Sequence, residues 1–335
     1  MAKIGMIGAG SWGVALAVLL EQNGHQVTIW SALEKEVQTL IKTRELVSLP
    51  GVRLSENVLV TADLETAVAG QDVLVLAVAS AYTREVAYRV AKFVSDRQKV
   101  VNVAKGIEER TLFTLSQVIE EEIPCADVAV LSGPSHAEEV GRGLPTTCVV
   151  GAKTKETAEY LQNIFMSPVF RVYTSPDILG IEVGAALKNV IALAAGIADG
   201  LGYGDNTKAA LITRGIAEIA RLGMKMGGKL QTFTGLSGIG DLIVTCASMH
   251  SRNRRAGILI GQGKTMEEAM AEVKMVVEGV YSAKAALGLA QKYEVEMPII
   301  EQVNQVLFYG KTASEAVTEL MLRDKTIEHS DLPWN

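Results

Sequence analysis

The chain has 335 residues, which at about 150 residues per domain predicts two domains. Its 32 lysines and arginines are outnumbered by 38 aspartates and glutamates, and the net charge of -6 excludes the broad basic surface that binds nucleic acid. Hydrophobic residues make up 48% and charged residues 21%, which excludes a disordered chain and is typical of a globular, enzyme-sized protein.

Three cysteines, Cys125, Cys148 and Cys246, lack the spacing of a disulfide framework or a zinc site. We therefore expect a cytoplasmic protein with no bound metal. The first 20 residues resemble a secretory signal only superficially, because four glycines disfavour the apolar helix of such a signal. The longest later apolar run, 183–198, is shorter than the roughly 20 residues that cross a bilayer, so no membrane segment is expected.

The first half of the chain alternates short β-rich apolar runs with helical segments. This alternation predicts parallel strands joined by helical crossovers, in an α/β sheet covered on both faces. The predicted strands cover residues 4–7, 27–30, 58–60, 73–78, 100–103, 128–131 and 147–150.

The second half shows helical spacing of its apolar residues, for example over 209–226, 282–292 and 299–308, without alternation of β-branched residues. A turn-forming cluster at 174–177 separates the two patterns. We therefore predict an α/β domain over residues 1–177 and an all-helical domain over residues 178–335.

A glycine-rich segment, Gly8-Ala9-Gly10-Ser11-Trp12-Gly13, joins the first predicted strand to the first predicted helix. In this context Gly8 permits a tight turn, Gly10 lets the backbone approach a pyrophosphate, and Gly13 allows close helix packing. The free N–H groups of the following helix would hold the anion. The segment thus predicts a doubly wound, Rossmann-type dinucleotide site; the alternative is a glycine turn without a ligand.

The end of the second predicted strand does not decide between NAD and NADP. An acid there would bind the ribose hydroxyls, and an arginine would bind a 2′-phosphate. Ser31 suits either group and Lys35 can reach a phosphate, so both cofactors stay open.

Polar residues follow two later strands. Lys105 comes after the fifth predicted strand, at the sheet edge where ligands bind in such folds, although an ordinary surface lysine fits the sequence equally well. Ser135 and Glu138 have the spacing of a capping box at a helix start, which predicts either backbone donors for a ligand or simply a helix cap. His136 is interpreted as a turn residue.

Lys188 lies in a segment that is apolar around most of its circumference. Lysine is seldom buried without a partner or a role, so its amine is predicted to meet a cleft, where burial and a nearby cation would lower its pKa. The alternative is a lysine whose head group reaches water.

Two further features follow. A glycine-rich loop leads to Asp241, which is either a ligand residue or a helix cap. Three arginines, Arg252, Arg254 and Arg255, lie within 251–255, where they and the added donors Ser251 and Asn253 could bind a phosphate through one or two of the arginines; the alternative is a solvated basic helix face.

Taken in order, the motifs closely resemble those of the bacterial NAD(P)-dependent glycerol-3-phosphate dehydrogenase family. The resemblance covers nearly the whole chain and implies a Rossmann domain and a helical substrate-binding domain with the active site between them. It implies reduction of dihydroxyacetone phosphate to sn-glycerol 3-phosphate, a phospholipid precursor, with NAD or NADP. The motifs are GAGSWG at 8–13, NVAKGIE at 102–108, SGPSHAEEV at 132–140, the run at 186–215, GLSGIGDLIVTC at 235–246, SRNRR at 251–255 and VVEGVYSA at 276–283.

The resemblance also implies residue roles, with Lys188 as the proton donor and acceptor. The residues implied to bind substrate are Lys105, Gly133, Ser135, Lys188, Asp241, Ser251, Arg252 and Asn253. With the glycine motif included, the cofactor-binding residues are Gly8, Gly10, Ser11, Trp12, Gly13, Lys105, Ala137, Arg252, Val276 and Glu278. At 31–33 the sequence Ser-Ala-Leu departs from the His or Arg that relatives often carry, which argues against strong NADP selectivity.

Two other functions stay open at this point. One is a dehydrogenase of the same architecture acting on a 3-hydroxy acid or on ketopantoate. The other is a cofactor-sensing protein without turnover, since a dinucleotide fold alone does not specify chemistry. A homodimer is expected from the apolar helical half.

Overall fold

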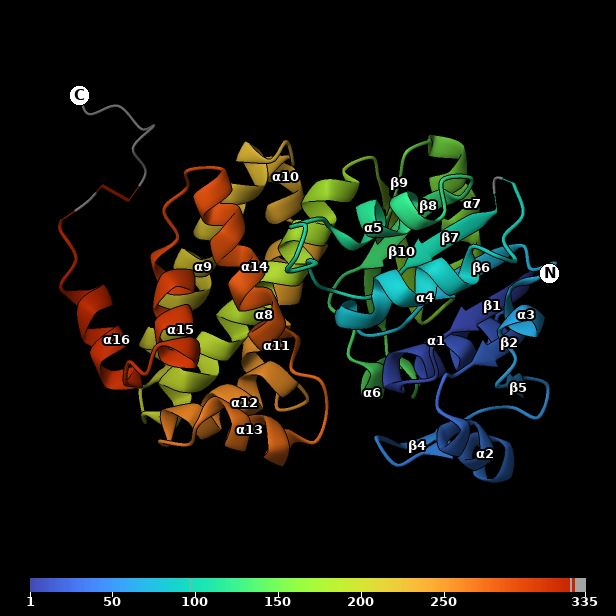
Figure 1. Cartoon of the computed structure of the whole chain (residues 1–335), viewed down its shortest axis with the longest axis horizontal. Coiled ribbons are helices and arrows are strands. Elements are labelled where there is room, and N and C mark those ends of the chain that lie inside the picture. Colours follow the sequence, from blue (N-terminus) through green and yellow to red (C-terminus); the bar gives the residue numbers. More distant parts are fainter. Residues whose placement is uncertain (97, 326, 329–335) are drawn as a thin grey trace.

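The computed structural model describes residues 1–96, 98–325 and 327–328; the end of the predicted second domain, 329–335, lies outside the described residues. A sheet-containing lobe and a helical lobe lie side by side (Figure 1). Among the described residues the last strand, β10, ends at Ser175, and the long helix α8 begins at Ile178. The predicted fold class, an α/β half followed by an all-helical half, is confirmed.

One eight-stranded sheet forms the centre of the first lobe, in the order β10-β9-β8-β7-β6-β1-β2-β5. Each of the seven predicted strands is present, and each end lies within two residues of its predicted position. The strands are β1 Lys3–Ile7, β2 Gln26–Trp30, β5 Leu59–Thr61, β6 Val73–Leu76, β7 Lys99–Asn102, β8 Asp127–Ser132, β9 Thr146–Ala152 and β10 Phe170–Ser175. A separate hairpin pairs β3 Glu45–Leu46 with β4 Leu49–Arg53.

Two features of the sheet differ from the prediction. The pairing of β8 with β9 is antiparallel, whereas the pattern predicted parallel strands throughout. The connection between them contains only the one-turn helix α6 (Ala137–Val140), and a parallel crossover needs a longer helix to return across the sheet. Strand β10 was also not predicted, although its buried Phe170 and Val172 alternate with exposed Arg171 and Tyr173.

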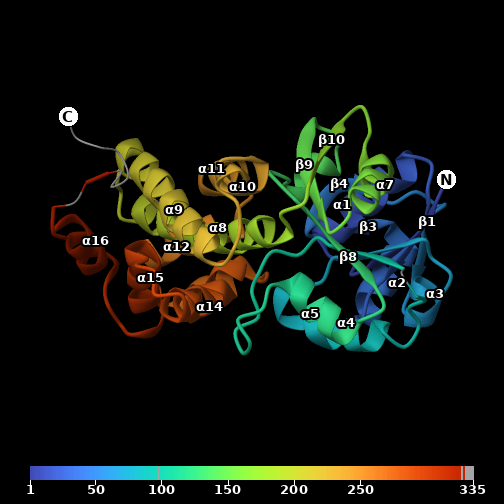
Figure 2. The ribbon, with the colours of Figure 1, turned by 90° about the horizontal axis from the view of Figure 1, so that it is seen from above.

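Helices cover both faces of the sheet, as Figure 2 shows for α4 and α5 on one side and α7 on the other. Successive residues of a strand point to opposite faces of the sheet and so contribute to two separate hydrophobic cores. Met6 and Ile29 pack with α1 and α7 on one face, and Ile7 and Trp30 pack with α3, α4 and α5 on the other. The helices of this lobe are α1 Ser11–Gln22, α2 Glu34–Thr43, α3 Leu64–Val68, α4 Thr83–Val90, α5 Leu115–Glu122, α6 and α7 Lys155–Phe165.

Helix α8 (Ile178–Gly200) is the core of the second lobe. It begins at the N-cap Asp177, whose carboxylate accepts the Gly180 N–H at 3.0 Å. It is long and apolar enough to cross a membrane, but 83% of its most apolar window is buried inside the protein. Around it pack α9 Asp205–Lys225, α10 Leu230–Phe233, α11 Asp241–Ala247, α12 Arg252–Gly261, α14 Glu278–Lys292 and α15 Pro298–Phe308. Helix α13 Met266–Val273 packs on α12, and α16 Ala313–Met321 packs on α15.

Helices α8 and α12 approach each other through glycines. Gly196 and Gly200 on α8 face Gly257 and Gly261 on α12. A Cβ atom on Gly257 would lie 2.2 Å from the carbonyl oxygen of Leu193, so the contact is backbone against backbone. Only glycine permits this spacing, because any larger residue would force the helices apart.

Gly257→Ala is expected to lower the free energy of unfolding by about 1–3 kcal/mol, because the added methyl group clashes with the α8 backbone. Urea denaturation measures the change. Gly240→Ala is the matched control, since its Cβ would meet its nearest neighbour at an ordinary 3.5 Å. Equal stability of the two variants would contradict the close helix contact.

Candidate active site

Two lysines from different lobes meet at one buried carboxylate. Lys105 follows β7, Lys188 lies in the middle of α8, and Asp241 is the first residue of α11. The Lys105 Nζ lies 2.7 Å from Asp241 Oδ2, and the Lys188 Nζ lies 2.8 Å from Asp241 Oδ1. Residues separated by 136 positions in sequence thus form a Lys105–Asp241–Lys188 ion triad at the junction of the lobes.

Hydrogen bonds hold both ammonium groups in place. Lys105 donates to the carbonyl of Gly133 at 3.0 Å and to the hydroxyl of Ser135 at 3.5 Å. Lys188 donates to the Thr245 hydroxyl at 2.7 Å. The structure therefore brings together five of the predicted substrate-binding residues: Lys105, Gly133, Ser135, Lys188 and Asp241.

The electrostatics of the triad favour proton exchange at Lys188. Burial lowers the pKa of this amine to about 8, with Lys105 also lowering it and Asp241 opposing the change. Burial alone raises the pKa of the Asp241 carboxyl, yet Lys105 and Lys188 outweigh it and hold that pKa below its ordinary value. Two cations share one anion, so the site can accept a further negative charge.

The turn before α6 differs from the predicted capping box. His136 occupies the N-cap position, and no side chain caps the helix. The hydroxyl of Ser135 instead donates to the Gly133 carbonyl at 2.9 Å, which keeps it beside Lys105. The pKa of His136 is lowered by burial and then by the charge of Lys188, so the imidazole is neutral close to the triad.

The three arginines at the start of α12 make different contacts. Arg254 pairs with Asp199 at 2.7 Å and donates to the Ala247 carbonyl, while Arg255 donates to the Val273 carbonyl. The Arg252 guanidinium makes no hydrogen bond or ion pair with any other described residue, and burial lowers its pKa. Of the three arginines, Arg252 is therefore the one available to an anionic ligand.

The other two predicted phosphate-binding residues also support α12. Ser251 is its N-cap and accepts the Arg254 N–H at 3.2 Å. The Asn253 amide donates to Asn189 Oδ1 at 2.9 Å and accepts the Gly279 N–H at 2.8 Å. Asn253 thus ties α12 to α8 and α14, which places the start of α12 relative to Lys188.

The glycine loop after β1 fits a dinucleotide. Gly8 has a φ of 119°, and Cβ atoms on Gly8 and Gly13 would meet backbone oxygens at 2.7 and 2.0 Å. A Cβ on Gly10 would meet nothing within 4 Å, which leaves open space over the start of α1 for a pyrophosphate. Ser11 and Trp12 begin that helix, and no side chain caps it, so its first N–H groups stay available.

The remaining predicted cofactor residues come from both lobes. Glu278 begins α14, and burial raises its pKa. Its carboxylate accepts the Ser80 N–H at 3.0 Å and also contacts the Ser80 hydroxyl, which links the two lobes. Val276 lies two residues before α14, and Ala137 begins α6 against the first core.

One buried acid was missed by sequence reasoning. Glu182 in α8 accepts the Asn102 amide at 2.9 Å and the Ser116 N–H at 2.9 Å. Asn102 in turn accepts the Ala104 N–H at 3.1 Å, so Glu182 supports the turn that carries Lys105. A single acid in an apolar helix is the same signal that identified Lys188, and it could have been found.

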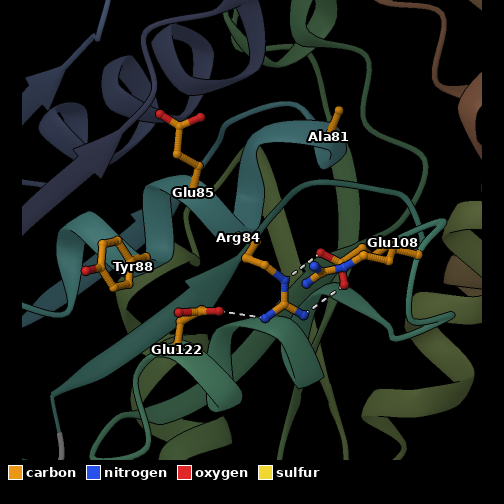
Figure 3. A pocket seen from close by; sticks show the side chains of 7 residues that line it. Ala81, Arg84, Glu85, Tyr88, Glu108 and Glu122 are labelled. Carbon is orange, nitrogen blue, oxygen red and sulfur yellow. Dashed lines mark hydrogen bonds and ion pairs between the residues drawn. The ribbon is translucent and has the colours of Figure 1, made fainter.

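A surface pocket next to α4 is occupied by its own charges. Figure 3 shows Arg84 pointing between Glu108 and Glu122, which it contacts at 2.6 Å each. These pairs join α4 to α5 and to the segment after Lys105. The ion pairs of Arg84 therefore fill this pocket and hold the neighbouring elements together.

Family models of NAD-dependent glycerol-3-phosphate dehydrogenase match the chain in two parts, the N-terminus model over residues 3–158 and the C-terminus model over residues 177–318. The chain belongs to this family. It is 65% identical to glycerol-3-phosphate dehydrogenase [NAD(P)+] from Agathobacter rectalis over 100% of both chains. The protein of the same name from Fusobacterium nucleatum is 64% identical over 98% of this chain and 99% of its own.

Solved structures agree with this assignment. The structure of glycerol-3-phosphate dehydrogenase from Coxiella burnetii is 35% identical and covers 96% of this chain and 99% of its own, with a TM-score of 0.93. A ketopantoate reductase from Ralstonia eutropha is 15% identical with a TM-score of 0.62, which shows a shared fold alone.

Asp241→Asn is expected to destabilise the protein by about 3–5 kcal/mol, because two buried ammonium groups lose their shared anion. Thermal and urea denaturation measure the loss. The double variant Asp241→Asn/Lys188→Met should recover part of it by removing one uncompensated cation. A double variant less stable than Asp241→Asn would contradict the triad.

Proposed function

We propose that the protein is an NAD(P)-dependent sn-glycerol-3-phosphate dehydrogenase that interconverts dihydroxyacetone phosphate and sn-glycerol 3-phosphate. The observation that carries the proposal is the Lys105–Asp241–Lys188 ion triad, which lies where the glycine-loop lobe meets the helical lobe. Family membership supports this substrate over a 3-hydroxy acid or ketopantoate. The buried lysine supports catalysis over binding without turnover.

Lys188 is the proposed acid and base. In the direction of ketone reduction its ammonium donates a proton to the oxygen that becomes a hydroxyl, and in the oxidation direction its neutral amine takes that proton back. Asp241 and the Thr245 hydroxyl hold the Nζ atom at 2.8 and 2.7 Å, so the amine is aimed before substrate binds.

Lys105 supplies a second positive charge. Its ammonium stabilises negative charge on the substrate oxygen, and Gly133, Ser135 and Asp241 orient it. Arg252 offers a planar, unpaired guanidinium for the substrate phosphate, together with Ser251 and Asn253 at the start of α12. In this proposal the residues at the start of α12 bind the phosphate end of the substrate, and the two lysines bind its carbonyl end.

Gly8, Gly10, Gly13, Ser11 and Trp12 would hold the pyrophosphate of NAD or NADP, and the open space over Gly10 fits this group. We place Lys105, Ala137, Arg252, Val276 and Glu278 along the rest of the cofactor. The nicotinamide, when bound, supplies or accepts the hydride.

The cellular setting follows from the same proposal. We infer a cytoplasmic enzyme whose product enters phospholipid synthesis, which the free thiols of Cys125, Cys148 and Cys246 support. We also infer a homodimer, supported by exposed apolar side chains such as Met321 at 79% and Leu322 at 78% exposure.

Oxidation of NADH and of NADPH by dihydroxyacetone phosphate, followed by absorbance, tests the function. Lys188→Met is expected to reduce turnover by about a hundredfold or more, because it removes the group that we propose transfers the proton. The variant should stay folded by circular dichroism, since methionine suits the apolar helix. Lys292→Met, at an exposed position, is the control. Turnover within a fewfold of wild type in Lys188→Met would refute the assignment.

The pH dependence should report the lowered pKa of Lys188. Ketone reduction needs the ammonium form, so its kcat/KM is expected to fall as the pH rises through about 8. Alcohol oxidation needs the neutral amine, so its kcat/KM should rise over the same range. Parallel steady-state profiles between pH 6.5 and 10 measure both, and two flat profiles would exclude Lys188 as the titrating group.

A further inference from the structure

The glycine loop lies directly against the end of β2. The Gly8 N–H donates to the Trp30 carbonyl at 2.9 Å, which places Ser31, the residue after β2, beside the proposed pyrophosphate site. In dinucleotide-binding folds, the residue at this place faces the adenosine ribose. The side chains around Ser31 therefore decide which ribose is accepted.

A carboxylate from the next helix, α2, lies against Ser31. The Ser31 hydroxyl donates to the carboxylate of Glu36, in the first turn of α2, and the Leu33 N–H donates to the Ser31 oxygen at 3.1 Å. The Ser31–Leu33 turn therefore returns Glu36 to the strand end. Sequence position alone hides this acid, because it lies five residues beyond Ser31.

Three arginines have partners in this part of the lobe. The Arg89 guanidinium lies over the ring of Trp30, the residue before Ser31, at 5.3 Å from its centroid. Arg44 pairs with Glu56 at 3.1 Å and donates to the Val58 carbonyl at 2.9 Å. Arg53 pairs with Glu45 and Glu56 at 3.9 and 3.7 Å. Within the described residues, none of these three guanidinium groups contacts Ser31 or Glu36.

Lys35 adjoins Glu36 in α2 and is exposed. Consecutive residues of a helix point about 100° apart, so Lys35 does not share the direction that brings Glu36 to Ser31. Within the described residues, the side chain that contacts Ser31 is thus an anion.

We propose that Glu36 is a specificity-determining residue that makes this enzyme prefer NAD(H) to NADP(H). Its carboxylate accepts hydrogen bonds from the ribose hydroxyls of NAD(H), and its charge repels the 2′-phosphate of NADP(H). Ser31 acts through Glu36, because its hydroxyl holds that carboxylate in place. The inference rests on the proposed function and names the cofactor for the same site.

Binding without turnover tests the proposal. Titration of the full-length protein with NADH and with NADPH, followed by nucleotide fluorescence, gives two dissociation constants for each variant. Wild type is expected to bind NADH at least about tenfold more tightly than NADPH, since like charges placed together are strongly unfavourable. Glu36→Gln should tighten NADPH binding by about tenfold, while the amide oxygen still accepts the Ser31 hydroxyl.

Two further variants complete the experiment. Glu34→Gln removes a charge from the same helical turn, but its carboxylate contacts Gln38, so the ratio of the two constants should not change. Leu33→Arg places a cation at a side chain that is 64% exposed next to Ser31 and should tighten NADPH binding.

Equal binding of the two nucleotides by wild type overturns the inference, as does a ratio that Glu36→Gln and Leu33→Arg leave unchanged. These results would leave the proposed function standing. If folded wild type binds neither nucleotide, the proposed function itself fails, and this inference fails with it.

Discussion

The site depends on one carboxylate that lies between two ammonium groups. Asp241 is buried, and without Lys105 and Lys188 its charge would be costly to keep out of water. The two lysines come from different lobes, so the same contact that positions the amines also holds the lobes together. The proposed proton transfer and the contact between the lobes therefore depend on the same interaction.

This arrangement gives the two lysines different chemistry. Lys188 is enclosed by α8 and α11, and burial lowers its pKa to about 8. Lys105 lies on a loop after β7, where its side chain keeps 17% exposure and reaches Gly133 and Ser135. The amine that we propose as the acid and base thus lies beside the amine that we propose to orient the substrate.

Periodicity and composition predicted most of the fold, because seven strands and the long helices carry strong apolar patterns. Strand β9 was predicted but its antiparallel direction was not, since pairing direction depends on the length of the connection and leaves no mark on the strand itself. The predicted capping box at Ser135 was wrong, because the Ser135 hydroxyl donates to the Gly133 carbonyl and does not cap α6. Lys188 was found from its apolar surroundings, but the contact of Glu36 with Ser31 arises only when the chain turns at Leu33.

The glycine contact between α8 and α12 has a consequence for the size of the substrate. Because the two backbones touch, the start of α12, with Arg252, cannot slide along α8, with Lys188. The distance between the backbone positions that carry Arg252 and Lys188 is therefore set by the main-chain contact and does not adjust through side-chain packing. In the proposed complex, this contact limits how far the phosphate of the substrate can lie from its reacting carbon.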